Sequence, residues 1–146
     1  MSTHKINSFT LDDKKLLVVY VETMQVKEGV SCDVYSFKDD DSKDLAIVTV
    51  DKGHKTPLQR ILKGKTTIEG FVSGKGILNV TSSDGEARRY EFDEKNPGEP
   101  VLVYIGDLMQ WHANGDRDLV FYEVCTPPYE DGRFENLPEN GSTPTA

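Results

Sequence analysis

The sequence predicts an all-β chain that folds as a single domain, in a sandwich or a barrel. The chain has 146 residues, a length that suits one domain with an ordinary core. Short runs rich in Val, Ile, Leu, Tyr and Phe recur along it, separated by Gly, Asp, Pro and Ser. No segment keeps the apolar period of about 3.6 residues that marks an amphipathic helix. Short strands at regular spacing with turn residues between them are typical of sandwiches and barrels.

The expected strands are separated by recognisable turns. Gly29 follows the first apolar run, and an acidic turn at 39–42 closes the second. Asp84-Gly85 is a strong hairpin signal, and Gly106-Asp107 separates two later runs. In chain order, the expected strands are 16–26, 32–37, 45–50, 57–62, 65–72, 77–81, 88–92, 100–105, 108–113 and 118–125.

The two ends of the chain are more polar than its middle. Residues 1–10 read as a mobile N-terminal tail. Residues 138–146 read as a mobile C-terminal tail, since 140–146 contain no apolar residue large enough to bury. The domain itself is expected at 11–137.

The charge of the chain excludes two classes of partner. Its 25 acidic residues outnumber its 17 basic ones, which gives a net charge of -8. Nucleic acids require clustered Lys and Arg, and an anionic membrane surface attracts the same residues. No run of about 18 apolar residues exists to span a bilayer. We therefore expect neither a nucleic acid nor a membrane partner.

The chain contains two cysteines, Cys32 and Cys125, far apart in the sequence. Their spacing matches no metal or redox motif. A cytoplasmic protein with two reduced thiols is the expectation, and a disulfide between strands is the alternative. Cys125 has no base beside it in the sequence, so we expect a structural thiol instead of a nucleophile.

The segment 53–74 resembles the first motif of the cupins, in which two histidines and a glutamate lie between glycines. Gln59 and Ile61 stand where that family has its metal-binding histidines, counting from Gly53. Thr67 stands in the glutamate position, counting back from Gly74. Further similarity lies in the Gly-Asp turn at 106–107 and in the final strand with its Pro-Pro exit at 119–129. The resemblance covers roughly 45–137.

The resemblance implies a single-domain cupin-like jelly-roll β-barrel and, since dimers are common in the family, a homodimer. It also implies that the usual metal site is absent. His112 matches the metal-binding histidine of the second motif in neither of two alignments. A mainly imidazole site needs two or three histidines, and the chain has three in all, of which His4 lies in the expected tail. We therefore expect no metal and no cofactor; a weak, oxygen-rich metal site at Gln59, Glu69 and His112 is the alternative.

Glu69 is the first candidate for chemistry. The two-residue period of a strand places Thr67, Glu69 and Phe71 on one face. If that face points inward, burial raises the pKa of Glu69 and prepares it as a general acid or base. In the alternative interpretation Glu69 faces solvent or pairs with Arg60.

The run Gln110-Trp111-His112 is the second candidate. If Gln110 and His112 face inward, they offer an amide and an imidazole to a polar ligand, and Trp111 packs outside or covers the barrel mouth. In the alternative interpretation, Trp111 lies in the core and His112 at the surface. The sequence does not decide between the two.

The last long run, 118–125, has two apolar faces. Val120, Tyr122 and Val124 share one face, and Phe121, Glu123 and Cys125 share the other. The strand is therefore buried on both sides or lies at an oligomer interface. After it, Pro127-Pro128 end the strand and fix an extended exit arm, which we expect to pack back through Tyr129 and Phe134.

Two functions fit these observations. The first is small-molecule binding without a standard metal centre, with a polar ligand held in the barrel by Gln59, Glu69, Gln110 and His112. Thr67 would also contact the ligand, while Phe71 and Trp111 would form the apolar walls. The second is an isomerase, epimerase or lyase acting on a sugar- or carboxylate-type substrate, metal-independent or weakly metal-dependent. In that case Glu69 or His112 would be the general base.

Overall fold

The computed structural model describes residues 5–138, and within them the chain is built entirely from β-strands and loops. The strands are β1 (Ser8–Leu11), β2 (Lys14–Lys27), β3 (Val30–Phe37), β4 (Asp40–Val50), β5 (Leu58–Ile61), β6 (Thr66–Ser73), β7 (Lys75–Thr81), β8 (Ala87–Asp93), β9 (Val101–Val103), β10 (Leu108–His112), β11 (Leu119–Thr126) and β12 (Phe134–Leu137). This confirms the predicted all-β fold.

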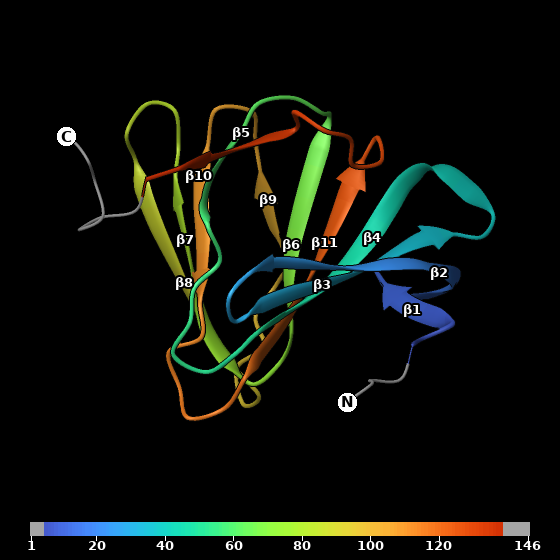
Figure 1. The fold of residues 1–146 in the computed structure, drawn as a ribbon, viewed down its shortest axis with the longest axis horizontal. Helices are drawn as coiled ribbons and strands as arrows, with labels where there is room; N and C mark the ends of the chain where they lie inside the picture. The colour runs from blue at the N-terminus through green and yellow to red at the C-terminus, as the bar shows by residue number, and fades with distance from the viewer. Residues whose placement is uncertain (1–4, 139–146) are drawn as a thin grey trace.

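The strands form two antiparallel sheets that curl toward each other as a jelly roll. The large sheet has the order β1-β2-β3-β4-β11-β6-β9, and the small sheet has the order β12-β5-β10-β7-β8. Figure 1 shows β7 and β8 at one side of the molecule, and β1 and β2 at the other. The glycine that joins β6 to β7 is Gly74, which has a φ of 91°. A Cβ there would lie 1.9 Å from the carbonyl oxygen of Asp118, so this turn requires glycine.

The centre of the large sheet, around β11, is buried on both faces. Val48 and Phe121 of its inner face pack in one core with Trp111 of the small sheet. The outer face of the large sheet carries a second core, where Phe9 meets Tyr122 edge to face at 4.9 Å between ring centroids. The prediction that the last long strand is buried on both sides is therefore correct within this single chain.

The predicted N-terminal tail is wrong for residues 8–10. These residues belong to β1, which pairs with β2 and covers the outer core. The signal was weak because β1 has only four residues. The predicted C-terminal tail lies outside the described residues except for Pro138. The acidic turn expected at 39–42 is also shorter than predicted, since β4 begins at Asp40.

The exit arm returns to the small sheet as expected. After Pro127-Pro128 the chain runs into β12, which pairs with β5 at the edge of that sheet. The rings of Tyr129 and Phe134 stack at 5.8 Å. The arm thereby closes one end of the space between the sheets.

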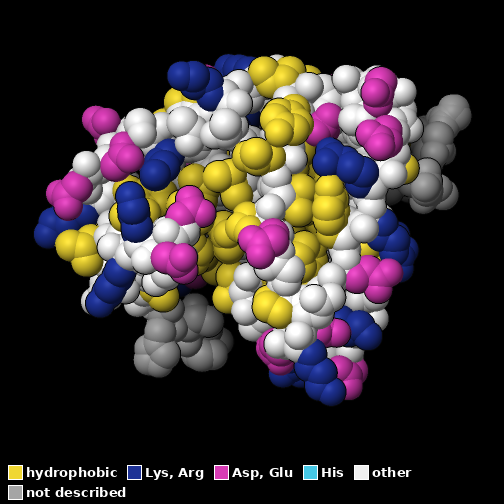
Figure 2. Space-filling view, turned by 180° about the vertical axis from the view of Figure 1, so that it is seen from behind, with side chains coloured by type: hydrophobic (Ala, Val, Ile, Leu, Met, Phe, Trp, Pro, Cys, Tyr) yellow, Lys and Arg dark blue, Asp and Glu magenta, His cyan; other side chains and the backbone are white. Residues whose placement is uncertain are grey.

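Hydrophobic side chains also reach the surface. Figure 2 shows them gathered across the middle of one face of the molecule, among acidic and basic side chains. The apolar residues of β2 are among the most exposed: Leu17, Val19, Tyr20, Val21, Met24 and Val26. Over residues 5–138, the fold contains no helix that could cross a membrane.

Candidate functional site

Two carboxyl groups face each other across neighbouring strands inside the barrel. Glu69 on β6 pairs in register with Glu123 on β11, and both point to the inner face. Glu69 is fully buried, and the indole N–H of Trp111 donates a hydrogen bond of 2.8 Å to its Oε1. Burial, and then the charge of Glu123, raise the pKa of Glu69 well above its ordinary value.

The second oxygen of Glu69 has no hydrogen-bond donor among the described residues. A buried carboxylate oxygen without a donor is costly. A protonated Glu69 removes this cost, because its hydroxyl then donates to the carboxylate of Glu123. The arrangement is thus a carboxyl–carboxylate pair in which Glu69 holds the proton.

Aromatic rings fill the barrel beside this pair. Trp111 stacks on Phe121 at 4.4 Å between ring centroids, and Phe92 lies 5.4 Å from Trp111 on its other side. Phe71 stacks on Phe92 at 5.8 Å. These rings exclude water from Glu69, so this part of the barrel is core and not a cavity.

An open cleft lies on the other side of Glu123. It has a volume of about 930 Å³ and extends from the inner face of β3, β4 and β11 to β5 and β12. Its walls include Val34, Ala46, Val48, Phe121 and Phe134. Among the polar groups that reach it are Gln59, Asn136, Asp44 and Glu123.

Gln59 lies at the rim of this cleft, as a ligand-binding role requires. Its amide Nε2 donates to Asn136 Oδ1 at 3.1 Å, which joins β5 to β12. Phe71 is half-buried against the core aromatics and does not line the cleft. Gln59 can therefore contact a ligand in the cleft, whereas Phe71 packs in the core outside the cleft lining.

Thr67 has a structural partner in place of a ligand. Its hydroxyl accepts a hydrogen bond of 3.0 Å from Arg133, whose guanidinium is buried. Arg133 also donates to the carbonyl oxygens of Thr66 and Pro127, at 2.7 and 2.8 Å. The buried cation therefore ties the start of β6 to the exit arm.

The inward orientation of Gln110 and His112 is wrong. Trp111 is buried in the core with Met109, so the two-residue period turns Gln110 and His112 to the outer face of the small sheet. The Gln110 amide donates to the carbonyl of Thr56 at 2.8 Å. Partial burial, and then Lys55, lower the pKa of His112. His112 cannot act on a ligand in the cleft.

The residues that sequence reasoning missed are Glu123, Asn136 and Arg133. Strand alternation already placed Glu123 on one face with Phe121 and Cys125, and this was the available signal. Its role depends on Glu69 standing opposite, which is a matter of pairing between strands 54 residues apart in sequence. Asn136 belongs to β12, which was not expected as a strand.

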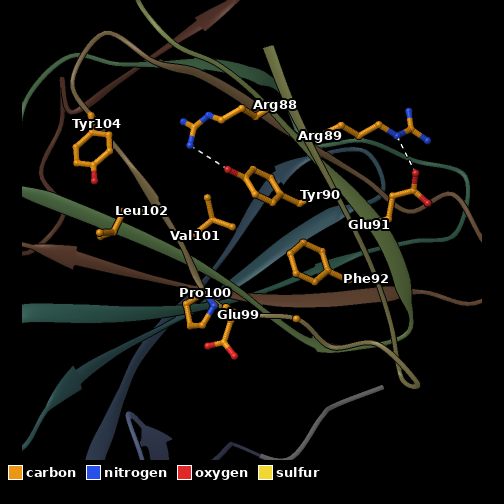
Figure 3. A pocket seen from close by; sticks show the side chains of 11 residues that line it. Arg88, Arg89, Tyr90, Glu91, Phe92, Glu99, Pro100, Val101, Leu102 and Tyr104 are labelled. Carbon is orange, nitrogen blue, oxygen red and sulfur yellow. Dashed lines mark hydrogen bonds and ion pairs between the residues drawn. The ribbon is translucent and has the colours of Figure 1, made fainter. Parts of the chain in front are cut away.

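A second hollow of about 490 Å³ lies between β8 and the segment 98–104. Figure 3 shows Arg88, Tyr90 and Phe92 along β8, opposite Pro100 and Val101. Three of its four charged side chains, Arg88, Arg89 and Glu91, already have partners. Arg88 donates to the Tyr90 hydroxyl at 2.9 Å. Arg89 similarly donates to Glu91 at 3.0 Å. The larger cleft is therefore the better candidate site.

Both cysteines are free and buried, which agrees with the expected reduced thiols. Burial, and then Glu123, raise the pKa of Cys32 to about 12 and raise that of Cys125 further. We expect each thiol in the native protein to react with a disulfide reagent at pH 8 roughly a thousandfold more slowly than in urea. If the native protein quickly released the reagent's chromophore in an amount equal to its thiols, this prediction would be wrong.

Solved structures share the architecture just described. CapF from Staphylococcus aureus, a capsular polysaccharide assembling protein, matches with a TM-score of 0.66 and 17% identity over 82% of this chain and 34% of its own. Oxalate decarboxylase from Bacillus subtilis matches with a TM-score of 0.63 and 25% identity, over 77% and 29%. The 7S globulin of Momordica charantia matches with 0.63 and 14%, over 84% and 36%. The chain has the cupin fold.

The cupin likeness extends no further than the fold. The chain spans about a third of the length of these structures. No protein-family model and no curated protein matches the sequence. The matched proteins include a decarboxylase and a globulin, so the shared fold does not by itself select a function.

The residues at the positions where cupins have their metal ligands do not fit a metal in this protein. Ile61 is a buried core residue, Thr67 accepts from Arg133, and Gln59 donates to Asn136. Within residues 5–138, no group of three or more His, Cys, Asp and Glu side chains gathers to hold a metal ion. The interior carboxyl, Glu69, instead accepts the indole N–H of Trp111.

Proposed function

We propose that this cupin binds a small molecule in the cleft between β3, β4 and β11 on one side and β5 and β12 on the other. The observation that carries the proposal is the cleft itself. Its volume of about 930 Å³ lies within the range of small-ligand sites. Its walls are largely apolar with a few polar groups, the usual combination in such sites.

The walls support a different ligand from the polar one that the sequence suggested. Val34, Ala46, Val48 and Phe121 offer apolar surface that a hydrophilic molecule would not bury favourably. The ligand therefore has a mainly apolar body and a polar group. Gln59 and Asn136 stand at the rim to orient it, and Glu123 meets the polar group at the floor.

Ala46→Trp tests the site because the indole fills the cleft from its β4 wall. We expect the dissociation constant of a neutral apolar dye, N-phenyl-1-naphthylamine, to rise at least about tenfold, since the wall area is lost to the ligand. The measurement is a fluorescence titration. Leu102→Trp is the matched control: it adds the same indole to the second hollow, and dye binding should stay unchanged.

Two results would contradict the proposed site. One is saturable dye binding that survives in Ala46→Trp and weakens in Leu102→Trp. The other is the absence of any saturable binding to the unmodified protein. A urea titration of both variants verifies that they fold.

A second function, proton transfer on a bound substrate, is favoured by the Glu69–Glu123 pair. An isomerase, epimerase or lyase needs an acid or base at the substrate, and Glu123 lines the cleft while Glu69 holds a proton behind it. His112 takes no part in this version. Exchange of a ligand C–H with solvent deuterium that depends on Glu123 would distinguish catalysis from binding.

The homodimer and the cytoplasmic location stay predictions. The exposed apolar residues of β2 support a dimer, because such side chains usually mark a contact surface. Light scattering tests the homodimer directly, because it measures the molar mass of the protein in solution.

A further inference from the structure

We infer that the ligand of the cleft carries a protonated nitrogen, an amine or an amidine, that pairs with Glu123. This inference rests on the proposed function and specifies its ligand class.

The lining of the cleft is strongly acidic. Lys43 is the one basic side chain among its lining residues, and its Nζ lies 3.6 Å from Asp40 and above the ring of Phe37. Arg133 lies nearby, but its guanidinium donates to carbonyl oxygens and to Thr67. The acidic lining residues are Glu22, Asp41, Asp44, Glu123, Glu130 and Asp131. A cation is the ligand charge that this lining attracts.

Glu123 is the one of these carboxylates that is held in place from behind. Glu69 is fully buried, and its Oε2 has no donor of its own within the described chain. Its proton bonds it to Glu123, and the thiol of Cys125 lies 3.7 Å from Glu123 Oε1. Among the ion pairs found in residues 5–138, none includes Glu123. A fixed carboxylate without a cation therefore faces the cleft.

Asp44 supplies a second acceptor close by. It stands opposite Cys125 on the neighbouring strand, one step along the same face from Glu123. Diagonal neighbours on a sheet lie within reach of each other's side chains. The backbone N–H of Tyr129 donates to Asp44 at 3.0 Å, which fixes its position. An ammonium group with three N–H donors can bond to both carboxylates, and it relieves their mutual repulsion.

The test compares three probes of equal chain length: octylamine, octanol and octanoate at pH 7, by isothermal titration calorimetry. We expect octylamine to bind at least about tenfold more tightly than octanol, and octanoate to bind most weakly. In Glu123→Gln, the preference for octylamine over octanol should shrink several-fold, with Asp44 retaining the remainder, while the affinity of octanol is unchanged. In Glu69→Gln the preference should persist, because the amide N–H donates to Glu123 as the protonated acid does.

The outcomes separate this inference from the proposed function. Equal, measurable affinity for octylamine and octanol overturns the cationic ligand and leaves the binding cleft in place. A preference that is undiminished in Glu123→Gln, or that is lost in Glu69→Gln, also overturns it. No binding of any probe, together with no binding of the neutral dye, overturns both. If Glu123→Gln does not fold, Asp44→Asn replaces it and should reduce the preference for octylamine.

Discussion

Arg133→Met is expected to lower the free energy of unfolding by about 2–4 kcal/mol, because buried acceptors lose a charged hydrogen-bond donor. The guanidinium donates to Thr67 and to the carbonyl oxygens of Thr66 and Pro127. Methionine keeps the length of the side chain but donates to none of them. The acceptors are then left without partners, and the contact between β6 and the exit arm is lost.

Urea unfolding at pH 7 measures this loss. Arg60→Met is the matched control, because Arg60 is partly exposed and its Nε lies 3.7 Å from Glu135. Exposed pairs of this kind contribute little, so we expect a change within about 1 kcal/mol. Equal losses in the two variants would mean that the hydrogen bonds of Arg133 do not stabilise the contact between β6 and the arm.

Glu69→Gln is expected to make the protein more stable at alkaline pH and to flatten the dependence of stability on pH. Burial raises the pKa of Glu69 above its ordinary value of 4.5, so the folded state binds its proton more tightly than the unfolded state does. The stability from this proton is fully present below pH 4.5. It decreases as the pH rises toward the folded-state pKa, by at most about 1.4 kcal/mol per pH unit.

The glutamine variant has no proton to lose, so its free energy of unfolding should lack this decrease. Urea titrations of both proteins between pH 5 and pH 9 give the two slopes. Glu135→Gln, on the exposed side of β12, should retain the wild-type slope. A wild-type slope that persists in Glu69→Gln would show that another group titrates, and the carboxyl–carboxylate pair would be wrong.

The strands were predictable where the local pattern was long. The alternation in β6 placed Thr67, Glu69 and Phe71 on one face, and that face is the inner one. The doubly apolar pattern of β11 predicted burial on both sides. The four-residue strands β1 and β12 were not predictable, because so few residues show no period and their pairing partners are set by tertiary contacts.

The candidate site was only half predictable, for a reason that lies in β10. The two possible orientations of Gln110-Trp111-His112 differ by one residue of register, and a short apolar run does not fix which face is inside. The structure selects the one that buries the largest apolar ring. Once Trp111 points inward, it reaches Glu69, and the predicted polar pair is displaced to the outer face.

The missing metal ligands were visible in the sequence, but what replaced them was not. Gln59, Ile61 and Thr67 showed that the usual donors are absent. In their place, Trp111 donates a hydrogen bond to Glu69, and Arg133 donates one to the hydroxyl of Thr67. Both depend on residues brought together from distant strands, which spacing along one strand cannot reveal.

Trp111 is the only tryptophan in the chain, and its indole N–H is bonded to the one carboxyl group that is wholly enclosed by the barrel. When the protein is excited beyond the absorption band of its tyrosines, its emission therefore originates from a single indole in direct contact with an ionisable neighbour. Trp111 is thus an intrinsic fluorescence probe at the centre of the molecule. Without any added label, its fluorescence reports the protonation of Glu69 and, through Glu123, the binding of a ligand in the cleft.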